Sequence, residues 1–355
     1  FKQKTAYEIM PSLVGSEMCI RDRFNDLLNY AKNVARRVNE VIFEIVKGEP
    51  KILYDAALHL IKAGGKRLRP LLLVLSGKLY GLSEDIGIKA GASVEILHNF
   101  TLIHDDIMDH DTTRRGVPTV HVLWGEDMAI LAGDLLFSLA YKALTNLMNY
   151  GISPERLVKA IDVLTWASKT VAEGQALDME LSRKDDATLE DYINMVYRKT
   201  AALFEASSAI GAILAGAPNE EVRKIREYAS CIGIAFQIRD DELGLVADEE
   251  KLGKPKYSDL REGKRTILVI HALNNLSEDK KNKLLSILGR RDASRNELEY
   301  AAKLIIDSGA LEFSNKLAQE YLERGVKALD STNYKDHKAK ELLLKLAYFF
   351  ARRQY

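Results

Sequence analysis

The sequence predicts an all-α protein, and two observations lead to this fold class. Apolar residues recur every three to four positions over long stretches, as in residues 24–45, where they form one stripe of an amphipathic helix. Alternating apolar and polar runs between hairpin turns, which would predict β-strands, are missing. Of the 355 residues 47% are hydrophobic, enough for a large core, and no linker-like stretch divides them. We therefore expect a single all-α domain over residues 24–355, with its sites on facing helices.

Residues 1–23 are left out of this domain. They show neither a helical period nor the long apolar core and small-residue cleavage site of a signal peptide. Their segment SLVGSEMCIRDR resembles a translated sequencing adapter. We expect a non-native or disordered leader.

Capping signals set the boundaries of several predicted helices. The first helix ends before Pro50, and a second, over about residues 51–63, ends before two glycines. Ser153 followed by Pro154 predicts an N-cap with proline at the first helical position. The sequence TLED at 188–191 has the form of a capping box.

Charge and cysteine content narrow the classes of function. Lysine plus arginine and aspartate plus glutamate both number 51, so no overall basic field favours nucleic acid. Cys19 and Cys231 lack nearby histidines, which argues against a disulfide framework or a zinc site and fits a cytoplasmic protein. The most apolar stretch, residues 128–148, contains Asp134 and Lys142, so we expect no membrane span.

A first acidic motif ends the helix predicted over residues 88–109. Residues 95–116 read EILHNFTLIHDDIMDHDTTRRG, so Asp105 and Asp109 lie one turn apart on one face with Asp106 beside them. Carboxylates this close raise one another's pKa unless a cation lies between them, and they oppose the dipole at a helix C-terminus. The alternative is a solvated helix end. Hard oxygen ligands of this kind suit Mg²⁺, which is often shared with substrate phosphates.

A second acidic motif, FQIRDDELG, follows at residues 236–244. It again ends an apolar helical run in adjacent carboxylates, Asp240 and Asp241, with Gln237 one turn earlier. Gly244 stands where a full D-D-x-x-D motif would have its last acid. Two acidic helix ends on one chain can face each other across a cavity. Basic stretches accompany them: GGKRLRP at 64–70, Lys199-Thr200, and GKPKYSDLREGKR at 253–265.

These motifs, in this order, closely resemble those of the trans-isoprenyl diphosphate synthases over about residues 24–355. The resemblance implies an isoprenoid-synthase-type helical bundle with a deep central cavity, found as a cytoplasmic homodimer. It also implies Mg²⁺-dependent head-to-tail condensation of isopentenyl diphosphate with an allylic diphosphate. In such a reaction an allylic cation forms, the isopentenyl double bond attacks it, and the departing diphosphate takes up the proton that is lost.

The resemblance implies roles for individual residues as well. Three Mg²⁺ ions would be held by Asp105, Asp109 and Asp240, with Asp106 and Asp241 as further catalytic acids. Isopentenyl diphosphate would contact Lys66, Arg69, His98 and Arg115. The allylic diphosphate would contact Arg114, Lys199 and Lys254, with Lys264 in the same loop as Lys254. The Thr200 hydroxyl and the Gln237 carbonyl would face the reacting carbons, where fixed dipoles stabilise a cation.

Product length is expected to depend on Phe100. This residue lies five positions before Asp105, hence ~7.5 Å lower along the helix, and its ring is large enough to form a floor. With threonine rather than a second aromatic at position 101, the pattern resembles archaeal-type geranylgeranyl diphosphate synthases, which implies a C20 product. Leu97 would form the next barrier. Farnesyl or longer products are the alternative, and periodicity alone would make Phe100 a core aromatic.

Two hypotheses from other classes stay open at this point. His104-Asp105 is typical of metal-dependent phosphohydrolases, although the second acidic motif and the GGKRLRP loop would then have no role. A non-catalytic regulatory subunit of a prenyltransferase would share the fold, but such subunits usually lose one aspartate motif. His98 by itself would be a buried core histidine, and the lysines of residues 251–264 would be solvent-facing.

Overall fold

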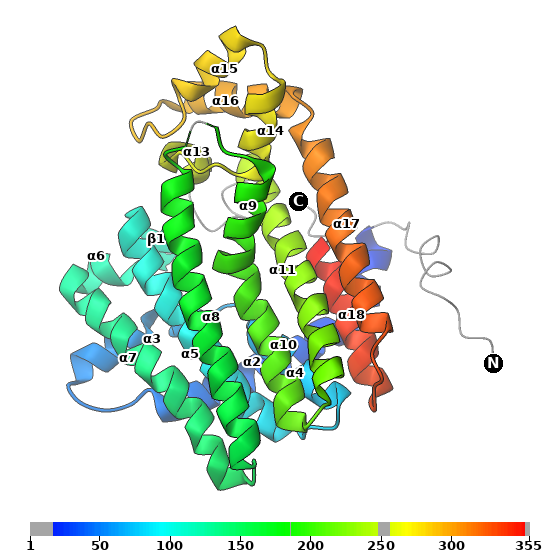
Figure 1. Cartoon of the computed structure of the whole chain (residues 1–355). Coiled ribbons are helices and arrows are strands. Elements are labelled where there is room, and N and C mark those ends of the chain that lie inside the picture. Colours follow the sequence, from blue (N-terminus) through cyan, green and yellow to red (C-terminus); the bar gives the residue numbers. More distant parts are fainter. Residues whose placement is uncertain (1–16, 185, 248–255, 352–355) are drawn as a thin grey trace.

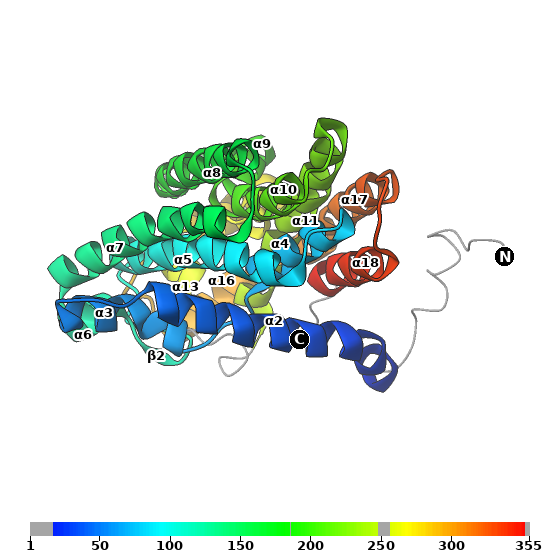
Figure 2. The ribbon, with the colours of Figure 1, turned by 90° about the horizontal axis from the view of Figure 1, so that it is seen from below.

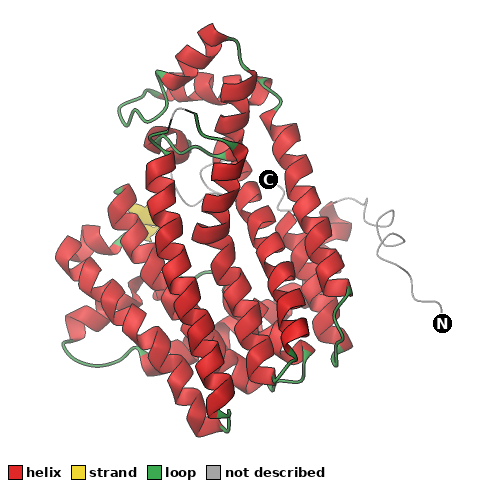
Figure 3. Cartoon of the chain, viewed as in Figure 1, coloured by secondary structure: helices red, strands yellow, loops and turns green. Residues whose placement is uncertain are grey.

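The computed structural model describes residues 17–184, 186–247 and 256–351, and nearly all of them are helical (Figure 3). The prediction of an all-α protein is confirmed. Within these ranges the only strands are β1 (Thr113–Arg114) and β2 (Val117–Pro118), which pair antiparallel. They close the short turn that follows the first acidic motif.

The helices follow one another without a repeat. Before the second acidic motif come α2 (Glu17–Ile45), α3 (Lys51–Lys62), α4 (Leu68–Leu79), α5 (Glu84–Asp109), α6 (Val120–Trp124), α7 (Glu126–Thr145), η2 (Asn146–Tyr150), α8 (Pro154–Leu181), α9 (Leu189–Val196), η3 (Tyr197–Ala201) and α10 (Ala202–Ala215). That motif lies on α11 (Asn219–Val246), and α13 (Ser258–Glu262), α14 (Ile267–Asn275), α15 (Glu278–Leu285), α16 (Arg295–Asp307), α17 (Ala310–Asp330) and α18 (His337–Ala351) complete the chain.

Helix α5 runs through the centre of the bundle. It packs against α4 and α7, while α10 packs against α4, α8 and α11. Seen from below, α5 lies among α2, α4, α7 and α10 (Figure 2). The helix that carries the first acidic motif is therefore held on several sides.

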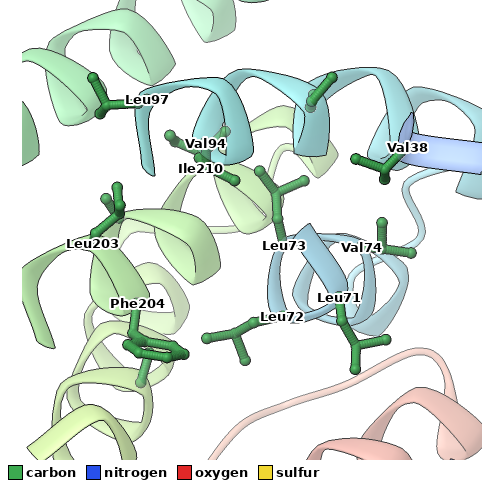
Figure 4. Close-up of a cluster of buried hydrophobic side chains, with 14 of the residues drawn as sticks. Val38, Leu71, Leu72, Leu73, Val74, Val94, Leu97, Leu203, Phe204 and Ile210 are labelled. Carbon is green, nitrogen blue, oxygen red and sulfur yellow. The ribbon is translucent and has the colours of Figure 1, made fainter. Parts of the chain in front are cut away.

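The main apolar core forms around α4. Leu71, Leu72, Leu73 and Val74 point in all directions around this helix, and all are buried (Figure 4). A helix that is apolar all round is stable only when other elements surround it. Gly211 of α10 permits this, since a Cβ at that position would lie 2.3 Å from the Leu73 carbonyl oxygen.

A second apolar cluster lies at one end of the bundle. It joins α14 and α16 to α9 and to parts of α11 and α17, in the upper part of Figure 1. These helices build the end of the molecule where the two acidic motifs meet.

The capping predictions agree with the structure. Ser153 accepts a hydrogen bond from the backbone of Arg156 with Pro154 as the first helical residue, and Thr188 and Asp191 form a reciprocal capping box. Helix α2 begins at Glu17, seven residues earlier than the apolar stripe indicated. The other residues of the expected leader lie outside the described part of the chain, and the domain boundaries stay a prediction.

The apolar stretch around α7 is closer to a membrane span in length and composition than its two charged residues suggested. Residues Glu126–Tyr150 are long and apolar enough to cross a membrane by length and composition, despite Asp134 and Lys142. Core helices of soluble proteins pass the same test, but such helices are mostly buried, whereas only 39% of the apolar 18-residue window within Glu126–Tyr150 is buried. An apolar face of α7 is therefore left on the surface.

Candidate active site

One large cavity lies between α5, α8, η3 and α11. Its volume is about 1340 Å³, above the ~300–1,000 Å³ of an ordinary ligand pocket. Carboxylates from both acidic motifs line it: Asp105, Asp109, Asp240 and Asp241. The two acidic helix ends thus share one cavity, as the sequence predicted.

An unbroken series of ion pairs joins the two outer aspartates of the first motif. Lys199 Nζ lies 3.3 Å from Asp105 Oδ1 and 2.7 Å from Asp178 Oδ2. Lys264 Nζ lies 2.8 Å from the same Asp178 oxygen and 3.1 Å from both oxygens of Asp109. Each of the five side chains is at most 25% exposed. Asp178 on α8 therefore holds both lysines over the acidic end of α5.

These contacts shift the pKa values of the groups involved. Burial, and then the charge of Asp105, raise the pKa of Asp109. Burial opposes the charged form of Lys199, but Asp105 and Asp178 nevertheless raise its pKa. The pKa of Lys264 is raised by Asp178 and Asp109 in the same way, against burial. Both lysines are therefore charged at neutral pH.

The middle aspartate of the first motif has a different environment. Asp106 is fully buried and forms an ion pair with Nε of Arg114. The Nη2 atom of Arg114 also lies 3.3 Å from Asp111 Oδ2. Burial raises the pKa of Asp106 to about 7, although Arg114 favours the charged form. Asp106 is absent from the cavity lining, so its direct effect is on the orientation of Arg114.

The aspartates of the first motif fit a divalent cation. Among the residues that the structure describes, no three His, Cys, Asp or Glu side chains are grouped closely enough to hold an ion by themselves. Mg²⁺ needs only one or two carboxylates when substrate phosphates and water complete its coordination. Burial, and then the charge of Asp105, raise the pKa of Asp109, and a cation bound beside the two carboxylates would favour their charged forms.

At the second motif, four side chains form a hydrogen-bonded series. Tyr192 donates to Asp241 Oδ2 at 2.8 Å, and Gln237 Nε2 donates to Asp241 Oδ1 at 2.8 Å. The Thr200 hydroxyl donates to Gln237 Oε1 at 2.9 Å. Burial raises the pKa of Asp241 to about 7. Thr200 and Gln237 meet at the cavity wall, and Asp240 also lines it.

Three of the predicted diphosphate-binding residues reach the cavity from the loop before α4, from the first turn of α4 and from α5. Lys66, Arg69 and His98 all line it. Arg69 Nη1 lies 3.1 Å from His98 Nε2, and since a guanidinium only donates, this nitrogen accepts. Burial, then Arg69, hold the pKa of His98 well below its usual range, so the ring is neutral.

Two arginines hold this loop in place. Arg67, which is 1% exposed, pairs with Glu95 at 2.9 Å and donates to the carbonyls of Gly64 and Ile61. Arg115 Nη1 donates to the carbonyl of Gly64 at 2.6 Å. Arg115 also lines the cavity, so it joins the loop to the site.

A π-helical turn, η3, carries Lys199 and Thr200. It interrupts the regular ladder between α9 and α10, and such turns often occur at functional sites. Gly174 of α8 faces this turn closely, since a Cβ there would lie 2.2 Å from the Lys199 backbone nitrogen. The absence of a side chain at residue 174 allows α8 and η3 to bring Asp178 and Lys199 together.

An aromatic cluster lies further along α5. The Phe100 ring centroid is 4.8 Å from that of His104 and 5.3 Å from that of Phe137 on α7, and Phe137 contacts Tyr141. All four line the cavity, as does Thr101. Leu97, in contrast, is fully buried in the core and does not line the cavity (Figure 4). Leu97 thus lies behind the present cavity wall, and its role as the next barrier stays a prediction.

Sequence reasoning left several participants without a role. Asp178 is four residues after Gly174, but only the fold shows that it holds two lysines. For Tyr192 and Phe137 the sequence pattern indicated only a position in the apolar core. Glu95 was only an isolated charged residue within an apolar helix. Lys254 lies outside the described residues, whereas Lys264 is placed over Asp109.

Comparisons with known proteins agree with this architecture. Residues 50–305 match the family described as polyprenyl synthetase. The chain is 45% identical to a geranylgeranyl diphosphate synthase of Sulfolobus acidocaldarius, covering 92% of this chain and 98% of that protein. It is 44% identical to a geranylfarnesyl diphosphate synthase of Aeropyrum pernix, covering 86% and 96% respectively.

Solved structures show the same fold. The geranylgeranyl pyrophosphate synthetase of Pyrococcus horikoshii superimposes with a TM-score of 0.86 at 39% identity, over 93% of this chain and 99% of that one. A geranylgeranyl pyrophosphate synthase of Corynebacterium glutamicum, complexed with isoprenyl diphosphate and magnesium, gives 0.84 at 28% identity, over 92% and 99%. The site described above therefore lies in a fold that binds this kind of ligand elsewhere.

Proposed function

This chain belongs to the polyprenyl synthetase family and is a prenyltransferase, and from this premise we propose that it condenses isopentenyl diphosphate with allylic diphosphates to give mainly geranylgeranyl diphosphate. The observation that carries the proposal is the single cavity lined by both acidic motifs and by the basic loop. A diphosphate with its metal would bind between the acidic ends, and a second diphosphate beside Lys66 and Arg69.

Different residues of the chain bind the two diphosphates and face the reacting carbon. Arg114 and Lys199 neutralise the allylic diphosphate, while Asp178 and Asp106 keep these two cations oriented. The neutral His98 and the Arg69 guanidinium hold the isopentenyl diphosphate. The Thr200 and Gln237 dipoles, fixed by their mutual hydrogen bond, face the carbon that becomes positive.

We further propose that magnesium is the cofactor, with three ions held by Asp105, Asp109 and Asp240. Bound metal supplies charge neutralisation on the diphosphate as its C–O bond breaks. The new bond joins the allylic carbon to the isopentenyl double bond, and the released diphosphate takes the proton. The magnesium complex of the related synthase supports the metal, and the number of ions is our own inference.

The C20 product is proposed from Phe100 and Phe137 together. Their rings are in contact across α5 and α7 at the cavity wall, so a growing chain would meet both. Relatives with geranylgeranyl and geranylfarnesyl products differ by one isoprene unit, so a small change of depth decides between them.

We also propose that the chain forms a homodimer through the outer face of α7. Ile130 and Leu131 are 45% and 53% exposed there, and Val122 and Leu123 continue the apolar surface on α6. Apolar surface of this extent commonly marks a protein interface.

The test is product analysis. The protein is incubated with labelled isopentenyl diphosphate and each allylic primer, and the dephosphorylated products are separated by chromatography. We expect C20 to dominate and turnover to stop in excess EDTA. Release of inorganic phosphate from nucleotides without prenyl product would favour a phosphohydrolase instead, and no turnover without an added partner would favour a regulatory subunit.

A further inference from the structure

The π-helical turn η3 has one side at the cavity and one side away from it. Lys199 and Thr200 line the cavity, whereas Tyr197, the first residue of the turn, is absent from the lining. The backbone nitrogen of Ala202 donates to the Tyr197 carbonyl five residues earlier, and this hydrogen bond makes the turn π-helical. Tyr197 therefore belongs to the turn but lies outside the site.

The Tyr197 hydroxyl donates to a buried carboxylate on the helix that follows the turn. The acceptor is Glu205 Oε2 on α10, at 2.9 Å, and the Glu205 side chain is only 8% exposed. The other oxygen of the same carboxylate, Oε1, accepts from Arg226 Nε on α11 at 2.7 Å. Glu205 thus joins the start of the turn to α11.

Arg226 extends this series of contacts to α8. Its guanidinium carbon lies 4.8 Å from the centroid of the Trp166 ring, within the range of a cation–π contact. Helix α10 packs against both α8 and α11. Tyr197, Glu205, Arg226 and Trp166, here called the Glu205 cluster, therefore connect η3 with three helices, and none of the four lines the cavity.

The backbone of the turn is enclosed by two of the same helices. A Cβ at Gly174 of α8 would lie 2.2 Å from the Lys199 backbone nitrogen. A Cβ at Gly233 of α11 would lie 2.9 Å from the Ala201 Cα. The turn is thus packed tightly between α8 and α11, and the Glu205 cluster ties its first residue to both of them.

We propose that Glu205 is a positioning residue for prenyl transfer, which through Tyr197 fixes the π-helical turn so that Lys199 and Thr200 meet the allylic substrate. The inference rests on the proposed function, because the roles of Lys199 and Thr200 come from it. Positioning of this kind matters because a displacement of about 1 Å can lower a rate ~10²-fold.

Tyr197→Phe is the sharpest test, because it removes one hydroxyl and keeps the ring. Steady-state kinetics are measured with the allylic diphosphate and isopentenyl diphosphate varied separately. We expect kcat/KM for the allylic substrate to fall about tenfold, through a raised KM and a lowered kcat. The KM for isopentenyl diphosphate should keep its wild-type value, since Lys66 and Arg69 lie on the loop before α4 and on α4 itself.

A matched control lies at the other end of α5. Tyr30 donates to Glu84 Oε2 at 2.7 Å, and Arg37 pairs with Glu84 Oε1 at 2.6 Å, so the same three side-chain types meet there. Glu84 begins α5, whereas Asp105 and Asp109 stand at its end. Tyr30→Phe should lower the melting temperature as much as Tyr197→Phe and leave both KM values unchanged. Equal kinetic effects of the two variants would overturn the proposal.

Variants of Glu205 itself test the link to the turn. Glu205→Gln keeps an acceptor for Arg226 and gains an amide that can donate to the Tyr197 hydroxyl, so it should retain most of the wild-type kcat/KM. Glu205→Ala removes both contacts and should lower kcat/KM for the allylic substrate at least as far as Tyr197→Phe does. Adding Tyr197→Phe to Glu205→Ala should cause little further loss, because both changes remove the same bond. Additive losses would show that the two residues act separately and would reject the proposal.

Hydrogen exchange separates the failure of this inference from that of the proposed function. Mass spectrometry of peptides covering residues 197–203 needs no substrate, and amide exchange there should be faster in Tyr197→Phe than in the wild type. Unchanged exchange would show that Glu205 does not hold the turn. Faster exchange with wild-type kinetics would reject only the positioning role. A wild type that gives no prenyl product would reject the proposed function and, with it, any role of Glu205 in prenyl transfer.

Discussion

At the scale of single residues, His98 shows how burial sets a protonation state. Its ring is neutral because it is buried and because four arginines surround it, so its pKa is well below the ordinary value of about 6.5. The folded protein therefore holds this histidine as an acceptor for Arg69.

The neutral His98 predicts a pH dependence of stability. Between its lowered pKa and about pH 6.5, the unfolded chain binds a proton that the folded protein does not, so the unfolding free energy falls as pH decreases. The slope for one such group is about 1.4 kcal/mol per pH unit. Urea denaturation from pH 5 to 7.5 should show a shallower decline for His98→Gln than for the wild type. Parallel declines would show that another group is responsible.

Residues also differ in how far their roles can be read from the sequence. A local pattern was enough to single out Asp105 and Asp109, because helical spacing alone places these two aspartates on one face. Lys199 was likewise singled out by its place in the short motif Lys199-Thr200. Asp178 contacts Lys199 and Lys264, which are 21 and 86 residues away, and no local pattern encodes those contacts. The cavity and its acidic ends could be predicted, whereas the aspartate that holds the two lysines could not.

At the scale of elements, the close approach of α8 and η3 sets the position of Lys199. Gly174→Ala would put a methyl group 2.2 Å from the Lys199 backbone nitrogen, so one of the two elements has to move. Overpacking of this kind typically costs ~1–3 kcal/mol. We expect a lower midpoint of chemical denaturation and a raised KM for the allylic substrate. Lys159→Ala, at an exposed site of the same helix, should change neither, and equal effects of the two variants would contradict this account.

The aromatic contact between α5 and α7 predicts product length. Phe100→Ala removes one of the two rings, so products longer than C20 should appear, and Phe100→Ala combined with Phe137→Ala should lengthen them further. Chromatography of the dephosphorylated products measures this. Phe313→Ala, on α17 outside the cavity, serves as the control. If Phe100→Ala and the double variant both keep the wild-type distribution, these rings do not form the floor.

At the scale of the whole molecule, the exposed apolar face of α7 predicts self-association. Leu131→Glu puts a charge in the proposed interface and should convert the dimer into a monomer in sedimentation velocity experiments. Tyr300→Glu, at a similarly exposed site on α16, should leave the dimer unchanged. A wild-type protein that sediments as a monomer at micromolar concentration would contradict the proposed dimer.

The carboxylate of Asp178, shared between two lysines, has a consequence for how a metal ion and a diphosphate affect each other's binding. Lys199 and Lys264 already compensate Asp105 and Asp109, so a metal ion that binds there competes with ammonium groups for the same oxygens. A metal ion that binds without diphosphate replaces the positive charge of a lysine beside the aspartates, so its net binding free energy is small. A diphosphate arriving with it offers the displaced lysines a new anion. On the proposed function, metal and diphosphate would therefore act as positive effectors of each other, and by linkage each would raise the affinity for the other by the same factor. Neither ligand alone would accumulate in the cavity at concentrations where the two together saturate it.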